Sequence, residues 1–233
     1  SKTFFGWNVT SGRPCLTPLT SAGLLDGACE TEHIHGLSIP AYVYPMFENA
    51  LRRRYGRTVE DHTKKIGGLM SHLSQGASGN PLAWFQESFT PEEIITVSDA
   101  NRNTAFPYTK RMNAMLLVNQ AAALMITSEK QAQKMGIDRS KWVYVHGYAE
   151  ANDHWNVLER EGYGFSPAIE IVGRTALTQA GASIGDIDFF DLYSCFPVAV
   201  QVTRDMLGIS EDDRRKLTVT GGLAYFVGPG NNY

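Results

Sequence analysis

The stretch IDFFDLYSCFP, residues 187–197, contains the pattern that decides the fold. Residues 187–193 form an apolar run typical of a buried strand, and residues 195–207 repeat apolar side chains with the period of a helix. The polar side chains of residues 193–195 lie between the two, beside the backbone N–H groups that a helix N-terminus leaves free. Such a junction can hold an anion or an oxyanion.

Further strands and helices alternate on both sides of this junction. This alternation predicts an α/β fold with parallel strands joined by helices, and it places function at the loops that leave the strand ends. Strands are expected at 118–127, 142–146 and 217–219, and helices at 128–136 and 166–179.

The chain before this region is predicted to be mostly helical. Helices are expected from residue 38 to about 55 and from Thr58 to about 75, then a short one near 82–85 and another opened by Thr90. The apolar face of the first is expected to contain Tyr42, Met46, Phe47, Ala50 and Leu51.

Composition excludes several classes of protein. The 233 residues include 21 Lys and Arg against 24 Asp and Glu, a net charge of −3 that is too balanced for a dedicated nucleic-acid binder. No apolar run approaches the roughly 20 residues that span a bilayer, and no secretory signal is present, so no membrane partner is expected. The three cysteines form no Cys-x-x-Cys pair, which favours a reducing compartment and a cytoplasmic location.

Two motifs each leave two interpretations open. Cys195 lies near a predicted helix N-terminus, where its thiol pKa could be lowered for nucleophilic attack; the alternative is a buried, inert cysteine. The glycine-rich stretch 218–233 could let the backbone approach a ligand closely, or it could simply form tight turns.

The histidines give weak signals. Two histidines and two carboxylates occur in 146–155, but their spacing fits no zinc signature, so a polar loop is expected and no metal site is predicted. The other histidines are predicted to lie in loops or on helix surfaces and to form no constellation: His33, His35, His62 and His72.

At 191–196 and 221–229 the sequence resembles the thiolase superfamily. The similarity is strongest to the sterol-carrier-protein-x-type thiolases and to actinobacterial thiolase-like proteins labelled acetyl-CoA acetyltransferases. Residues 103–113 and 118–123 look like the stretch that returns the family's loop domain to its core sheet. Residues 166–169 resemble the turn that opens a core helix.

The resemblance implies the thiolase fold, a five-layer α-β-α-β-α arrangement, here incomplete and with a mostly helical inserted loop domain. Residues 1–37 would be an irregular remnant of the N-terminal half, 38–113 the loop domain, and 114–233 the core α/β layers including the start of the C-terminal half. The segments bearing the two active-site cysteines of thiolases would then lie before Ser1 and after Tyr233, so a partial chain is expected.

Two departures from the family pattern affect chemistry. Active thiolases have Asn-Glu-Ala-Phe or His-Asp-Cys-Phe where this chain has Tyr-Ser-Cys-Phe at 193–196, and Gly-His-Pro where it has Val-Gly-Pro at 227–229. In the family the missing histidine activates the nucleophilic cysteine and donates to the thioester oxyanion. Losing one such donor costs on the order of 100- to 1000-fold in rate.

The function implied is a thiolase-like acyl-CoA acyltransferase of the acetyl-CoA acetyltransferase type, an enzyme of lipid metabolism that performs 3-ketoacyl-CoA thiolysis or condensation. Two alternatives stay open because of the lost histidine. One is a non-catalytic acyl-CoA-binding protein, and the other is a lyase that cleaves a β-hydroxyacyl-CoA by a retro-aldol reaction with Tyr193 as acid or base.

The resemblance also implies site residues. Tyr193 and Cys195 are the catalytic candidates. Coenzyme A contacts are expected from Gly221, Gly222, Gly228, Pro229, Gly230, Asn231, Asn232, Lys110 and Asn113, with Arg52 and Arg53 as weaker candidates. No permanently bound cofactor is expected, because the coenzyme A thioester is the substrate. The oligomeric state is open between a homodimer and a complex with a small partner subunit.

Overall fold

The computed structural model describes residues 28–37, 39–115, 117–154 and 156–228. Its α-helices are α1 (Glu30–Ile34), α2 (Pro40–Arg54), α3 (Val59–Ser78), α4 (Pro91–Ile95), α5 (Glu129–Lys134), α6 (Pro167–Ala180) and α7 (Pro197–Met206). Two short strands, β1 (Asn103–Ala105) and β2 (Tyr108–Thr109), pair antiparallel. Short 3₁₀ turns are η1 (Lys110–Met112), η2 (Arg139–Lys141), η3 (Val157–Glu159) and η4 (Ile184–Asp186), and η5 (Leu223–Val227) is one turn of π-helix. No helix within these ranges is long and apolar enough to cross a membrane.

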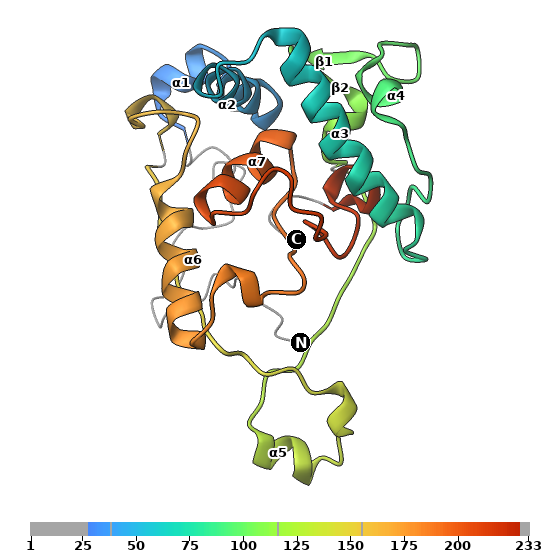
Figure 1. The fold of residues 1–233 in the computed structure, drawn as a ribbon, viewed down its shortest axis with the longest axis vertical. Helices are drawn as coiled ribbons and strands as arrows, with labels where there is room; N and C mark the ends of the chain where they lie inside the picture. The colour runs from blue at the N-terminus through green and yellow to red at the C-terminus, as the bar shows by residue number, and fades with distance from the viewer. Residues whose placement is uncertain (1–27, 38, 116, 155, 229–233) are drawn as a thin grey trace.

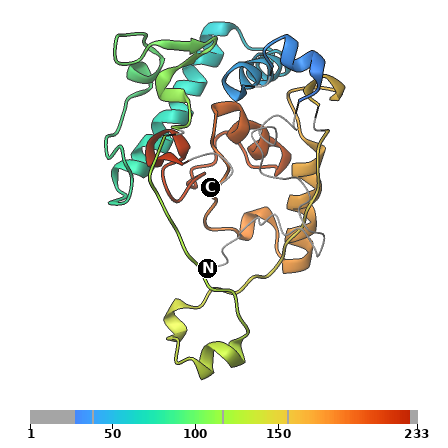
Figure 2. The ribbon, with the colours of Figure 1, turned by 180° about the vertical axis from the view of Figure 1, so that it is seen from behind.

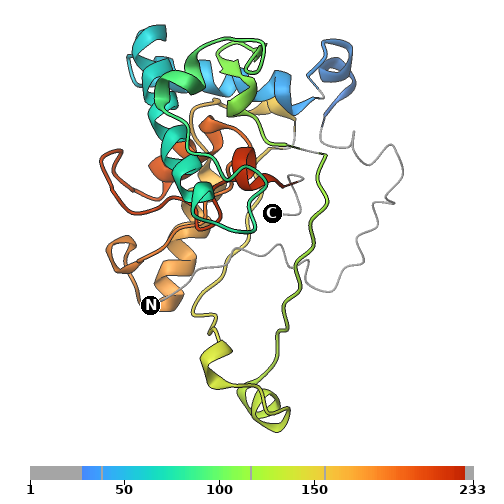
Figure 3. The ribbon, with the colours of Figure 1, turned by 90° about the vertical axis from the view of Figure 1, so that its right-hand side faces the viewer.

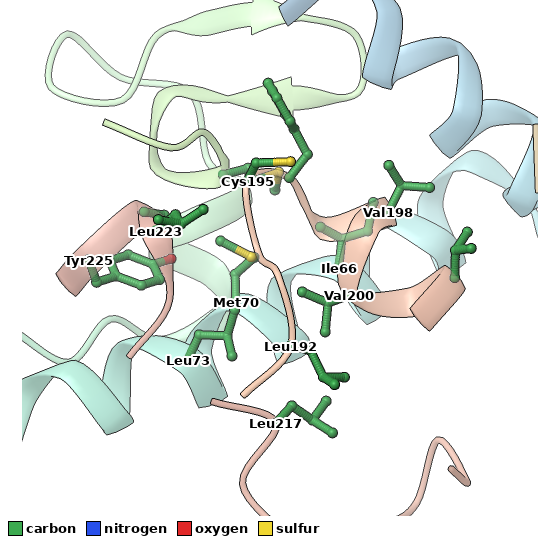
Figure 4. Packing of buried hydrophobic residues seen from close by; sticks show 14 of the residues in the cluster. Ile66, Met70, Leu73, Leu192, Cys195, Val198, Val200, Leu217, Leu223 and Tyr225 are labelled. Carbon is green, nitrogen blue, oxygen red and sulfur yellow. The ribbon is translucent and has the colours of Figure 1, made fainter. Parts of the chain in front are cut away.

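Helix α7 lies between three other helices that it contacts, with α2 above it, α3 to its right and α6 to its left in Figure 1. It begins directly after the Tyr-Ser-Cys-Phe stretch, and Val198 and Val202 on its inner face are buried. Side chains of α3 meet residues 192–200 in the core, among them Ile66, Met70 and Leu73 (Figure 4). The core therefore fixes the position of the loop that precedes α7.

Three of the four helices predicted in the N-terminal region form near their expected positions, as α2, α3 and α4. Thr58 caps α3 by accepting a hydrogen bond from the Asp61 N–H, and Thr90 caps α4. The predicted inner face of α2 is wrong at Tyr42, which is 53% exposed. The buried face instead contains Glu48, a charged residue that a hydrophobic pattern assigns to the surface.

The expected parallel strands do not form in the described part of the chain. Residues 117–127 and 142–146 are two extended arms that lead out to α5 and back (Figures 1, 2 and 3). Most of their apolar side chains are exposed, with Leu117 at 91%. The physical reason is that a strand needs a neighbour to pair its backbone groups, and no other described segment lies alongside these arms in a ladder.

The two other predicted strands, 187–193 and 217–219, do lie side by side without forming a regular ladder. Phe190 and Leu192 donate their N–H groups to the carbonyls of Lys216 and Leu217, at 3.4 and 2.9 Å. The segment 190–192 is therefore extended and paired, although irregularly, as it enters the loop before α7.

Two shorter expectations were also wrong. No helix forms at 82–85, because the N–H groups of Trp84 and Phe85 bond instead to carbonyls of η5. The five-residue helix α1 lies inside the region predicted to be irregular, of which residues 1–27 lie outside the described residues.

Candidate functional site

The loop at 193–196 is joined by hydrogen bonds to the two other segments that the sequence singled out. The Ser194 hydroxyl accepts from the Leu223 N–H at 3.0 Å, which ties the loop to the glycine turn at 221–222. The carbonyl of Cys195 accepts from the Ala114 N–H at 3.0 Å, which ties it to the end of the predicted return segment. The structure thus brings together motifs that lie up to 110 residues apart.

The glycine turn packs closely against protein. Gly221 has a φ of +112°, and a Cβ placed on it would lie 2.4 Å from the Cα of Ala77 in α3. A Cβ on Gly222 would lie 3.0 Å from the Ser194 hydroxyl oxygen. Gly228 is buried, and residues 229–232 lie outside the described residues. The tight-turn interpretation accounts for these two glycines without a ligand.

Cys195 does not have the lowered pKa of an activated nucleophile. Burial raises the pKa of its thiol to about 11, and hydrogen bonds with the Tyr44 and Tyr193 side chains offset only part of that rise. Of the two interpretations that the sequence leaves open for Cys195, the structure therefore favours the buried, inert cysteine.

Tyr193 lies at the wall of a cavity of about 420 Å³ between α2, α6 and α7. Its side chain is 36% exposed, whereas its neighbours Ser194 and Cys195 are buried. Burial, with the Cys195 thiol beside it, raises the pKa of Tyr193 above its usual range, so the phenol keeps its proton at neutral pH. Most of the other residues lining the cavity are apolar: Leu37, Pro40, Val43, Phe47, Val157, Phe165, Ile169, Val198, Ala199 and Val202.

The polar part of the cavity wall is an ion pair. Arg160 bonds to the Asp153 carboxylate at 2.7 Å, and the Ser166 hydroxyl, which caps α6, donates to the same oxygen. Burial alone would raise the pKa of Asp153, but these hydrogen bonds and the Arg160 charge outweigh it and lower the pKa. The ion pair also borders an adjoining, more polar cavity of about 600 Å³.

The predicted coenzyme A contacts in the return segment do not line either cavity. The Asn113 amide donates to the Thr104 hydroxyl at 3.0 Å and to the Thr109 carbonyl, so it stabilises its own loop. Lys110 is exposed, and Arg52 donates to the Arg57 carbonyl at 2.9 Å. Their role toward coenzyme A stays a prediction.

The histidine predictions need one correction. His62 is not on a helix surface: it is buried, and its Nε2 lies 2.6 Å from a carboxylate oxygen of Glu48. His146 and His154 are exposed. Within the part of the chain that the structure describes, no group of three or more His, Cys, Asp or Glu side chains is arranged to hold a metal ion.

Sequence reasoning missed three residues near the site: Tyr44, Asp153 and Arg160. Tyr44 lies on α2 one turn before the buried Glu48, so the two side chains share a face of the helix. A hydrophobic pattern does not find this face, because it assigns Glu48 to the surface. Asp153 lies in a polar loop that the sequence analysis considered only for metal binding.

Comparison with known proteins identifies the fold. A monomeric SCP2-thiolase like protein type 1 from Mycobacterium smegmatis superposes with a TM-score of 0.78 and 40% sequence identity, over 87% of this chain and 44% of that chain. The chain belongs to the thiolase superfamily. The incomplete thiolase fold implied by the sequence motifs is thereby confirmed.

Other relatives agree. A 3-ketoacyl-CoA thiolase of Aeromonas hydrophila is 29% identical over 176 residues, and human sterol carrier protein 2 is 22% identical over 179 residues. A structure described as an Ltp2-ChsH2(DUF35) aldolase shares the fold at a TM-score of 0.65 and 18% identity, over 84% of this chain and 53% of that one. The matched region covers 73% and 72% of this thiolase-like chain, but only 42% and 31% of these two curated relatives. No family model matches it.

Proposed function

We propose that this chain is the acyl-binding part of a thiolase-like acyl-CoA acyltransferase. One observation carries the proposal: the protonated Tyr193 phenol lies at the wall of a largely apolar cavity of about 420 Å³. An apolar cavity with a few convergent polar groups suits an acyl chain that ends in a reactive thioester. The similarity to 3-ketoacyl-CoA thiolases and to an SCP2-thiolase like protein supports a coenzyme A thioester as the substrate.

In this proposal Tyr193 acts as a hydrogen-bond donor and acid. When the bond between the α- and β-carbons of the acyl thioester breaks, its electron pair stays on the α-carbon as an enolate. This enolate must be stabilised at oxygen and protonated at carbon. A phenol that keeps its proton at neutral pH is suited to donate and unsuited to act as a base. Cys195, whose thiol pKa is raised, is not suited to be the nucleophile, so we assign that role to a residue outside the described part of the chain.

A second candidate is a lyase that cleaves a β-hydroxyacyl-CoA by a retro-aldol reaction. It is favoured by Gly228, which stands where active thiolases have the histidine that activates the cysteine. A retro-aldol reaction needs no acylated cysteine: a base removes the β-hydroxyl proton, the carbon–carbon bond breaks to give a carbonyl product, and Tyr193 protonates the resulting enolate. The fold shared with a described aldolase is compatible with this chemistry.

The proposal also covers the loop domain, the cellular location, the cofactor and the assembly. Residues 38–113 act as a loop domain that supplies Tyr44 and Phe47 to the cavity wall. The protein works in the cytoplasm, without a permanently bound cofactor. The similar structures include a protein described as monomeric and one described as an Ltp2-ChsH2(DUF35) aldolase, and we keep both a homodimer and a small partner subunit as assemblies to test.

The test uses the purified full-length gene product, first with acetoacetyl-CoA and free coenzyme A and then with a β-hydroxyacyl-CoA. Loss of the 3-ketoacyl thioester supports the acyltransferase, and release of a carbonyl product supports the lyase. Tyr193→Phe is expected to lower kcat by about 100-fold while thioester affinity is unchanged. Tyr148→Phe, at an exposed tyrosine that does not line the cavity, is the matched control and is expected to keep full turnover.

Each contrary outcome is specific. A folded protein that binds acyl-CoA but turns over neither substrate is a binding protein, and both catalytic proposals fail. Full turnover by Tyr193→Phe removes Tyr193 from the mechanism.

A further inference from the structure

A buried hydrogen-bond network centred on Glu48 lies beside the candidate site. One carboxylate oxygen of Glu48 accepts from the Gln201 amide at 2.8 Å and lies 2.6 Å from the His62 Nε2. The other oxygen accepts from the Tyr108 hydroxyl at 2.7 Å. All four side chains are buried, and they come from four elements: α2, α3, β2 and α7. Burying a carboxylate costs free energy unless its oxygens have hydrogen-bond partners. The network therefore favours the one arrangement of these four elements in which Glu48 keeps all its partners.

The network contacts the N-terminus of α7, which has no side-chain cap of its own. Phe196 occupies the N-cap position of α7 and has no side-chain oxygen to accept from the first free N–H groups of the helix. The Tyr108 side chain lies at this end of the helix: its ring stacks on the Phe196 ring, and its hydroxyl donates to Glu48. The Glu48 carboxylate therefore orients the side chain that packs against the N-cap residue of α7.

The same residues also contact the loop before α7. The Phe196 ring stacks on Tyr108 at 5.5 Å between ring centroids and on Tyr44 at 4.5 Å. Tyr44 lies one turn before Glu48 on α2, with its side chain beside the Cys195 thiol. Glu48 therefore holds two side chains that contact the first half of α7. One is Gln201, in the second turn of the helix, and the other is Tyr108, which packs at the start of the helix.

We propose that Glu48 is a positioning residue, which through Tyr108 and Gln201 fixes the N-terminus of α7 and thereby the placement of Tyr193 at the cavity. The consequence for activity rests on the proposed function, but the structural part does not. Loss of the network leaves the Tyr108 and Gln201 side chains without the carboxylate that orients them, and it lets the loop at 193–196 open more often.

The test replaces Tyr108 with phenylalanine, which keeps the ring that stacks on Phe196 and removes only the hydroxyl. In the full-length protein, labelling of the buried Cys195 by iodoacetamide is followed by mass spectrometry of its peptide under native conditions. Tyr108→Phe is expected to accelerate this labelling by about tenfold, because the hydrogen bond that fixes the Tyr108 side chain is lost and the buried Glu48 carboxylate keeps one partner fewer. Glu48→Gln is the second variant and is expected to act in the same direction, since an amide cannot serve the same donors.

Ile94→Val is the matched control, because it removes one buried methylene group from α4, a helix that contributes no side chain to the network. It is expected to lower the melting temperature without accelerating the labelling of Cys195. Equal labelling in Tyr108→Phe and Ile94→Val at matched melting temperature would overturn the proposal. For an active enzyme, Tyr108→Phe is further expected to lower kcat more than it raises KM.

The two proposals fail separately. If Cys195 is labelled faster in Tyr108→Phe than in the unchanged protein, but turnover does not depend on Tyr193, the positioning role of Glu48 is supported and the proposed function is contradicted. If labelling of Cys195 in Tyr108→Phe is no faster than in the unchanged protein, but turnover depends on Tyr193, the proposed function is supported and the positioning role of Glu48 is overturned.

Discussion

Replacing Gly221 with alanine is expected to lower the free energy of unfolding by about 2–5 kcal/mol. Two terms contribute. The backbone φ of +112° is unfavourable for any residue with a Cβ and costs about 1–2 kcal/mol. The new Cβ would also lie 2.4 Å from both the Cα and the Cβ of Ala77, far inside the ordinary separation of about 3.5–4.0 Å between carbon atoms. Relieving this overlap requires the turn or α3 to move, at about 1–3 kcal/mol.

The control is Gly208→Ala, because Gly208 has a φ of +70° and no atom would lie within 4 Å of its Cβ. This variant is expected to show only the backbone cost of about 1–2 kcal/mol. Urea unfolding of both variants, with hydrogen exchange at residues 221–227, measures the difference between them. Equal costs would refute the argument that Gly221 is needed for its packing against α3, and they would revive the interpretation that the turn is kept open for a ligand.

Three other substitutions test local parts of the structure. Thr90→Ala removes one side of the reciprocal cap with Glu93 and is expected to cost about 1 kcal/mol in urea unfolding. Asn101→Ala removes a buried amide that donates to three backbone carbonyls and accepts from the Arg111 N–H, so thermal and urea unfolding should show a loss of about 2–3 kcal/mol. The lowered pKa of Asp153 adds stability that is present above its unfolded-state pKa and is lost as the pH falls through its folded-state value. Stability measured from neutral to acidic pH should therefore fall less steeply in Asp153→Asn.

The helices could be predicted from the sequence because their signals are local. Thr58, Thr90, Ser128 and Ser166 each accept from a backbone N–H three residues along the chain, and each stands where the sequence placed a helix start. The information for such a boundary is contained within four residues. Proximity in space between distant segments is not needed.

The strands could not be predicted in the same way, because a strand is defined by its partner. The run at 118–127 has the composition of a buried strand, yet in the described structure it is an exposed arm with no adjacent strand. The composition of a segment indicates how well its side chains suit a buried sheet. Whether the segment pairs depends on a second segment, which lies far away in the sequence or outside the described part. Glu48 and His62 were missed for a related reason: each looks like a surface residue until the other is placed beside it.

The direction of the Cys195 pKa shows how tertiary structure overrides a local signal. A helix N-terminus favours a negative charge by at most about 1–2 kcal/mol, and this effect falls off within the first turn. Cys195 precedes the N-cap residue Phe196, and Pro197 at the first helical position has no N–H to offer. Burial raises the thiol pKa from 9.0 to about 11, which corresponds to roughly 3 kcal/mol in favour of the neutral form. Burial therefore outweighs the helix, and the half-exposed Tyr193, which keeps its proton and lies at the cavity wall, is the residue of this loop on which the proposed chemistry depends.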